Sequence, residues 1–146
     1  MRPTPPVRAD FRAFRPITTR WMDNDVYGHV NNAIYYSFFD TVVSGWLVDN
    51  GIVDYERGRV IGLAVNSECS YFEPISFPEA ITGGMRVGRI GSSSVTYSVG
   101  IFRGENDLAA AAGTFTHVYV DRDTRRPVPL SDSVRAKLES VLVSAA

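Results

Sequence analysis

The residues best suited to chemistry lie together in one short stretch of the chain. Between Arg20 and Asn32 the sequence reads RWMDNDVYGHVNN, which supplies two carboxylates, an imidazole and several amides. Carboxylates and imidazoles transfer protons, and carboxylates also attack carbonyl carbons. If the protein has an active site, we expect it here.

A long apolar segment follows this stretch and predicts a helix. From Asn32 onward, apolar pairs recur every four residues, at Ile34/Tyr35, Phe38/Phe39, Val42/Val43 and Trp46/Leu47. This spacing places side chains along one broad helical face. Asn31 or Asn32 can cap the start, and Asn50 with Gly51 suits the end. Apolar residues cover more than half of this helix, so we expect other structure to surround it.

The start of this helix matters for chemistry. The first N–H groups of a helix have no partner within it, and together they carry about half a positive elementary charge. The amides near Asn31, Asn32 and Ala33 can therefore polarise a carbonyl group and stabilise the oxyanion formed when it is attacked. The loop and the helix start together predict a site for carbonyl chemistry.

The rest of the chain predicts mainly strands. A short strand is expected at 14–19, and segments rich in Val, Ile, Thr, Tyr and Phe follow at 59–71, 79–87, 93–102 and 108–120. Short turns between the later segments favour antiparallel hairpins. A modest helix is expected from Ser131 to about Val143. The pattern predicts an α+β fold in which one curved antiparallel sheet wraps around one long central helix.

Length and composition indicate one soluble globular domain. The chain has 146 residues, a formal net charge of -1 and 45% hydrophobic residues. We expect a flexible N-terminal tail at 1–13, which holds three prolines, and a single domain at 14–146. The near-zero charge supplies no broad positive field for nucleic acid, and no apolar run reaches the roughly 18 residues of a membrane span.

The cysteine content and the possible metal ligands further limit the expected location and chemistry of the protein. The single Cys69 cannot form a disulfide within the chain, so the reducing cytoplasm is the expected location. Asp23, Asp25 and His29 have the right side chains for a metal ion, but they share one short loop and no further ligand is evident. We therefore expect no metal.

The motif W-x-D-x-D-x-x-G-H-V-N-N at 21–32, followed by Tyr35, Tyr36, Phe39 and Asp40, resembles the 4-hydroxybenzoyl-CoA thioesterase branch of the hotdog-fold thioesterase superfamily. The resemblance extends over roughly residues 14–122 and the inferred order of elements also matches. It implies a hotdog fold and a homo-oligomer, a dimer that extends the sheet or a dimer of dimers, with each active site at a subunit interface.

The same resemblance implies an acyl-CoA thioesterase and assigns roles. Asp25 would be the catalytic carboxylate and the backbone N–H of Asn32 the oxyanion donor. Asp25 would either attack the carbonyl to give a mixed anhydride or activate a water molecule, and the sequence leaves both routes open. Supporting roles are expected for Gly28, His29, Asn31 and Asp40.

Substrate contacts are expected from two places. Tyr35 can line an acyl pocket, as can some of Tyr36, Phe39, Trp46 and Phe72. Arg89, Ser92 and Ser93 stand where some relatives hold the phosphates of coenzyme A, but only one arginine is present, so a carrier-protein thioester is an alternative. Arg125 and Arg126 form a second basic candidate. Coenzyme A would be part of the substrate, and no separate cofactor is expected.

Two other functions compete with thioester hydrolysis. A carboxylate before a helix often only caps it, so the chain could bind acyl thioesters without cleaving them. Hotdog hydratases and dehydratases pair a histidine with an acid, but at spacings unlike that of Asp25 and His29. Asp23 is expected to be structural, bonded to loop amides or to an arginine.

Overall fold

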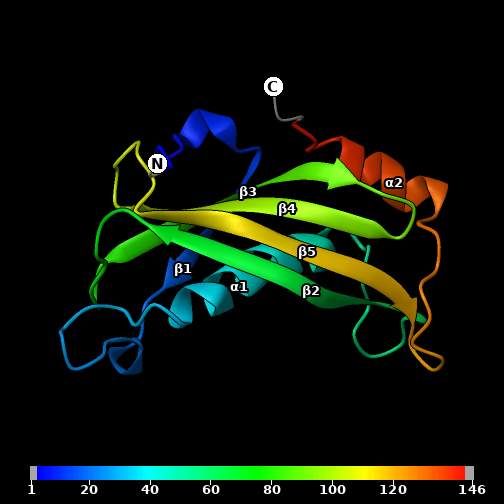
Figure 1. The fold of residues 1–146 in the computed structure, drawn as a ribbon, viewed down its shortest axis with the longest axis horizontal. Helices are drawn as coiled ribbons and strands as arrows, with labels where there is room; N and C mark the ends of the chain where they lie inside the picture. The colour runs from blue at the N-terminus through cyan, green and yellow to red at the C-terminus, as the bar shows by residue number, and fades with distance from the viewer. Residues whose placement is uncertain (1–2, 144–146) are drawn as a thin grey trace.

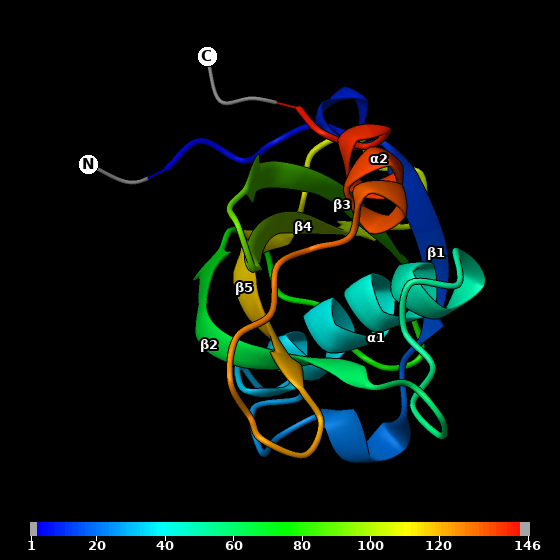
Figure 2. The same ribbon diagram turned by 90° about the vertical axis from the view of Figure 1, so that its right-hand side faces the viewer.

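The computed structural model describes residues 3–143; residues 1, 2 and 144–146, which the expected tail and domain included, lie outside that range. Within it, the chain forms one five-stranded antiparallel sheet in the order β1-β3-β4-β5-β2. The elements are β1 (Ala13–Thr18), α1 (Ile34–Asp49), β2 (Val60–Tyr71), β3 (Ala80–Ile90), β4 (Ser94–Arg103), β5 (Ala111–Asp121) and α2 (Asp132–Glu139). Figures 1 and 2 show the sheet curving around α1, which confirms the predicted fold class.

The central helix is held by close packing against the sheet. It buries Tyr35, Phe38, Phe39, Val42, Val43 and Leu47, and full burial of such a side chain stabilises the fold by about 1.5–3 kcal/mol. A Cβ atom at Gly83 of β3 would lie only 2.2 Å from Val42, and one at Gly113 of β5 only 2.9 Å from Phe39. Glycine at these two positions therefore lets the helix approach the sheet.

The ends of α1 agree with the predicted helix at one end and differ at the other. Gly51 has φ +66°, the left-handed conformation expected after a helix. At the start, Ala33 precedes the helix and provides no side-chain cap. The predicted capping by Asn31 or Asn32 is therefore wrong in detail, because the Asn31 Oδ1 atom accepts the N–H of Ala33, before the first helical residue, at 2.9 Å.

The two edges of the sheet are β1 and β2. Pro16 lies in β1, where an edge position tolerates the missing N–H. The other edge strand, β2, is long, and its middle residues 64–68 are exposed. Val65 in that stretch is 59% exposed. One whole side of β2 thus has no strand beside it within residues 3–143.

The N-terminal segment lies against the sheet from residue 3 onward. The N–H of Ala109 donates to the Pro6 carbonyl at 2.9 Å, and Phe11 is only 5% exposed. The Phe11 ring packs over Gly84 and Gly100, where a Cβ atom would meet it at 3.1 and 2.7 Å. The segment expected to be a flexible tail is thus in contact with the domain.

The last strand begins later than its composition predicts. β5 starts at Ala111 because residues 108–110 bond elsewhere: Leu108 forms an isolated bridge with Val7, and Ala110 donates to the Ile101 carbonyl. Among residues 3–143, neither helix is long and apolar enough to cross a membrane.

Candidate active site

The motif stretch folds into a tight loop between β1 and α1. The Asp25 N–H donates to the His29 carbonyl at 2.9 Å, and the Gly28 N–H donates to the Asp25 carbonyl at 3.0 Å. This turn needs φ +80° at Gly28, a conformation that glycine adopts at little cost. The expected supporting role of Gly28 is therefore one of backbone conformation.

A second segment, residues 75–77, fixes the loop from one side. The Val30 N–H donates to the Ile75 carbonyl at 2.7 Å, and the Ser76 hydroxyl donates to the Gly28 carbonyl at 2.9 Å. The loop is thus held by contacts with residues about fifty positions further along the chain, which no local pattern in the sequence predicts.

The two carboxylates of the loop have different environments. Asp23 is 1% exposed and accepts bonds from the backbone N–H and the guanidinium of Arg20 at 2.8–3.0 Å. Asp25 is half-buried; its Oδ1 atom accepts the Tyr27 N–H at 2.9 Å, and its Oδ2 atom accepts the Asn31 side-chain amide at 3.3 Å. Asp23 is therefore the buried partner of Arg20 in a structural ion pair, whereas Asp25 is held in place but remains accessible to solvent.

The backbone N–H of Asn32 differs from those of its neighbours in its hydrogen bonding. The Asn31 N–H donates to the Asp23 carbonyl, the Ala33 N–H to Asn31 Oδ1, and the Ile34 N–H to the Asn31 carbonyl, each at 2.9 Å. The Asn32 N–H has no acceptor anywhere in residues 3–143. It is a donor at a helix start, available for a ligand.

Asp25 and Asn32 line the same cavity, which has a volume of about 540 Å³. Its other lining residues are Tyr27, His29, Val30, Tyr35, Tyr71, Phe72, Glu73 and Pro74. His29 is exposed, and its imidazole forms no hydrogen bond with the described part of the chain. Burial raises the pKa of Tyr35 to about 12, so this side chain stays neutral. The structure thus brings together the predicted residues Asp25, His29, Asn32 and Tyr35.

The charged groups that line this cavity are acidic. Besides Asp25 there is Glu73, whose carboxylate lies 3.9 Å from the Arg103 guanidinium. That guanidinium is closer to Glu79, at 2.6 Å. Arg103 therefore compensates Glu79 first, and among the residues that the structure describes no arginine or lysine lines the cavity.

Tyr71 is a residue of the site that the sequence did not single out. It ends β2, and its hydroxyl donates to the Asn32 carbonyl at 2.8 Å. Its ring packs edge-on against Tyr35 with centroids 5.1 Å apart. The one available signal was its place at the end of a predicted strand, and that did not reveal a partner 39 residues away.

The residues expected to contact the phosphates of coenzyme A lie away from this cavity. Arg89 is near the end of β3, and Ser92 and Ser93 form the turn into β4. β3 begins at Ala80, which pairs with Thr18 just before the motif loop, so this turn lies at the far end of the strand. Figure 1 shows the two at opposite ends of the sheet. One chain does not bring Arg89, Ser92 or Ser93 to Asp25.

Asp40 also lies outside the Asp25 cavity. It is exposed on α1, accepts the Ser44 hydroxyl at 3.1 Å, and lines a second cavity of about 440 Å³ with His117. His117 is 5% exposed, and its Nδ1 atom has no partner within the described residues. Burial lowers the pKa of His117, and the nearby Asp40 carboxylate partly offsets this effect.

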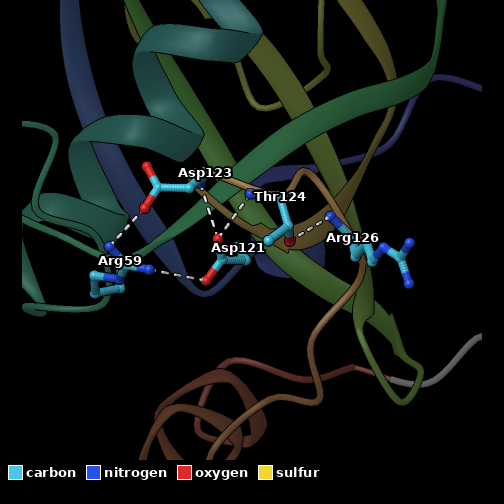
Figure 3. Close-up of polar contacts among 5 residues, drawn as sticks. All are labelled: Arg59, Asp121, Asp123, Thr124 and Arg126. Carbon is cyan, nitrogen blue, oxygen red and sulfur yellow. Dashed lines mark hydrogen bonds and ion pairs between the residues drawn. The ribbon is translucent and has the colours of Figure 1, made fainter.

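The second basic candidate is a turn after β5. Arg59 pairs there with Asp123 at 2.8 Å and with Asp121 at 3.4 Å, while the Thr124 hydroxyl accepts the Arg126 N–H. Figure 3 shows the Arg126 guanidinium pointing away from these carboxylates. The carboxylates of this turn are therefore engaged by Arg59, and neither Arg125 nor Arg126 forms an ion pair within the described residues.

A metal site is not assembled in the described ranges. No three His, Cys, Asp or Glu side chains from residue 3 to residue 143 lie close enough together to hold an ion. In the loop, Asp23 turns inward to Arg20, while Asp25 and His29 line the cavity.

Comparison with known proteins gives a consistent set of matches. A family model described as the thioesterase-like superfamily matches residues 19–138. The crystal structure of the PA5185 protein from Pseudomonas aeruginosa is 47% identical, covers 97% of this chain and 99% of its own, and has a TM-score of 0.93. The PA2801 protein from the same organism is 28% identical, with 86% and 96% covered and a TM-score of 0.79. The DHNA-CoA thioesterase from Staphylococcus aureus, at 18% identity, 92% and 98% coverage and a TM-score of 0.78, shares the fold.

Proposed function

Because the chain belongs to the thioesterase-like superfamily, we propose that it is an acyl-CoA thioesterase with Asp25 and the Asn32 amide at its centre. The observation that carries this proposal is the Asn32 N–H, which has no acceptor among residues 3–143 and belongs to a residue lining the same cavity as the Asp25 carboxylate. Hydrolysis of a thioester needs one group to deliver oxygen to the carbonyl carbon and another to stabilise the resulting oxyanion.

In this mechanism the thioester carbonyl oxygen accepts the Asn32 N–H. An oxygen atom adds to the carbonyl carbon, the C–S bond breaks, and the thiolate leaves and takes up a proton. A backbone donor of this kind lowers the barrier by about 2.7–4 kcal/mol. The apolar wall formed by Val30, Tyr35 and Phe72 would take the acyl group.

Asp25 can deliver the oxygen in two ways. It can take a proton from a water molecule that attacks, or it can attack directly and form an anhydride that water then opens. A single turnover in ¹⁸O-labelled water tests the routes. Label in the Asp25 carboxylate shows direct attack, with water opening the anhydride at the Asp25 carbonyl. Label in the product acid alone is expected when Asp25 activates water, and also when water opens the anhydride at the acyl carbonyl.

The CoA thioester is the favoured substrate form. One structural neighbour carries the name DHNA-CoA thioesterase, and coenzyme A would then be part of the substrate and not a cofactor. The cavity itself holds no arginine or lysine for the nucleotide phosphates. An acyl-carrier-protein thioester is therefore the alternative that the substrate panel must include.

The test is thiol release from aromatic and aliphatic acyl-CoA and acyl-carrier-protein thioesters. We expect turnover by the wild-type protein and a loss of about 10²- to 10⁴-fold in Asp25→Asn. Asp49→Asn is the matched control, because Asp49 pairs with Arg15 on the surface of α1, outside the cavity.

The outcomes are distinct. Equal rates in wild type and Asp25→Asn would remove Asp25 from the chemistry. Binding without thiol release across the panel would favour a non-catalytic acyl-thioester module, and water addition to an unsaturated acyl-CoA would favour a hydratase.

We also propose that the protein is a homo-oligomer built through the open edge of β2. An unpaired edge strand is a template for another strand, and β2 offers 12 residues with an exposed centre at Val65. Val65→Lys should shift the mass in analytical ultracentrifugation toward the monomer. An unchanged mass would place the interface elsewhere or leave the protein monomeric.

A further inference from the structure

The contact between Tyr71 and Asn32 joins the end of β2 to the start of α1. The Tyr71 hydroxyl donates to the Asn32 carbonyl at 2.8 Å. In a regular helix that carbonyl would accept the N–H four residues on, at Tyr36. Here the Tyr36 N–H donates to the Ala33 carbonyl at 3.3 Å instead. Tyr71 thus supplies the hydrogen bond that the Asn32 carbonyl would accept from the Tyr36 N–H in a regular helix.

Both peptide groups that flank Asn32 are anchored. The preceding one is held because the Asn31 carbonyl accepts the Ile34 N–H at 2.9 Å. The following one is held at both ends, by Tyr71 at its carbonyl and by Asn31 Oδ1 at the Ala33 N–H. With both groups fixed, the Asn32 N–H has a defined direction before any ligand arrives.

The same arrangement reaches Asp25. The Asn31 side chain accepts the Ala33 N–H with its oxygen and donates to Asp25 Oδ2 at 3.3 Å with its nitrogen. Rotation of the peptide between Asn32 and Ala33 toward a helical geometry would therefore disturb the Asn31 side chain as well. Tyr71 thus anchors the peptide that follows the oxyanion donor, and the Asn31 side chain links that peptide to the Asp25 carboxylate.

We propose, on the basis of the proposed function, that Tyr71 is a positioning residue that sets the direction of the Asn32 amide for catalysis. Preorganised donors stabilise a transition state because they need not reorient during the reaction. The Tyr71 ring rests edge-on against Tyr35, so loss of the hydroxyl alone leaves that packing in place. Burial raises the pKa of Tyr71, and its hydroxyl remains a donor at working pH.

The first test is the Tyr71→Phe variant in steady-state kinetics. A misplacement of about 1 Å at a reacting group can cost up to about 10²-fold in rate, so we expect kcat to fall by about 10- to 100-fold, with KM changed less than about twofold. The matched control is Tyr97→Phe, which removes a buried hydroxyl bonded to Tyr119 on the sheet, outside this cavity. Its kcat should stay at the wild-type value.

The second test is hydrogen exchange at the Ala33 amide, which needs no turnover. Exchange at Ala33 is compared with that of core amides, which report any loss of global stability. Relative to them, we expect faster exchange in Tyr71→Phe, because the peptide carrying that N–H loses its anchor, and the wild-type ratio in Tyr97→Phe. If the wild-type protein released no thiol, the proposed function would fail, while exchange would still decide whether Tyr71 orders this peptide.

Three results would overturn the proposal. They are unchanged kcat in Tyr71→Phe, a rise in KM alone, which would indicate a direct substrate contact, and unchanged exchange at Ala33.

Discussion

Two polar regions of this protein make a useful comparison. The first is the loop and helix start around Asp25, and the second is the cluster of Tyr97, His117 and Tyr119 on the inner face of the sheet. The side chains of the second region are 0–5% exposed, although His117 also lines the cavity of about 440 Å³ beside Asp40. Burial raises the pKa of Tyr97 and brings that of Tyr119 to about 12. In the first region Asp25 is half-buried and His29 exposed beside an open cavity.

The difference shows that a pKa shift caused by close packing does not by itself identify a site of chemistry. A displaced pKa is often taken as a sign of function, but in the Tyr97 cluster burial of the side chains is the first cause of every shift. At Asp25 the informative features are access to a cavity and bonds that hold the carboxylate. We therefore expect substitutions in the first region to change rate, and those in the second to change stability.

Of the three predictions that test this comparison, the largest effect is expected on rate, in Asn31→Ala. This variant loses the acceptor of the Ala33 N–H and the donor to Asp25 together, so kcat should fall by about 10²-fold, the scale for a misplaced reacting group. The measurement is thiol release with the preferred substrate. Asn106→Ala, in the turn between β4 and β5, is the control, and an equal loss there would remove the distinction between the regions.

The next effect is on stability, in Tyr97→Phe. The hydroxyls of Tyr97 and Tyr119 lie 2.7 Å apart and are buried, so removing one leaves the other without its partner and should cost about 1–3 kcal/mol. Urea unfolding measures this loss. A stable variant with reduced kcat would contradict the division between the two regions.

The smallest effect is a pH dependence from His117. Its pKa in the folded state lies below the ordinary 6.5 because burial disfavours the charged ring. As pH falls below 6.5, the unfolded chain takes up a proton that the folded chain resists, so the free energy of unfolding decreases. His117→Gln should flatten this dependence between pH 7.5 and 5.5 in urea titrations. A slope unaffected by His117→Gln would mean that the ring is not sealed in solution.

The fold was largely predictable because its signals are local. The four-residue spacing in 34–47 predicted α1, and the composition of 59–120 predicted the strands. What failed depended on distant partners. Phe11 contacts Gly84 and Gly100, residues more than seventy positions away, so the prolines around it suggested only a tail.

The site was predictable in part, for a similar reason. A contiguous motif placed Asp25, His29 and Asn32 together, and they do share a cavity. Tyr71 was missed because its role depends on one contact across 39 residues. Arg89 was expected beside the substrate, but the path of β3 places it at the other end of the sheet. The proposed contact of Arg89 with substrate and the cytoplasmic location stay predictions.

The packing of Phe11 has a consequence for how this sequence can diverge. Gly84 and Gly100 face each other across β3 and β4, and the rings of Phe11 and Phe14 lie over them. A Cβ atom at Gly100 would collide with the Phe11 ring at 2.7 Å, whereas one at Gly84 would meet the Phe14 ring first, at 2.9 Å. Among descendants of this chain, a larger residue at position 100 is therefore tolerable only with a smaller one at position 11, and these two positions should change together.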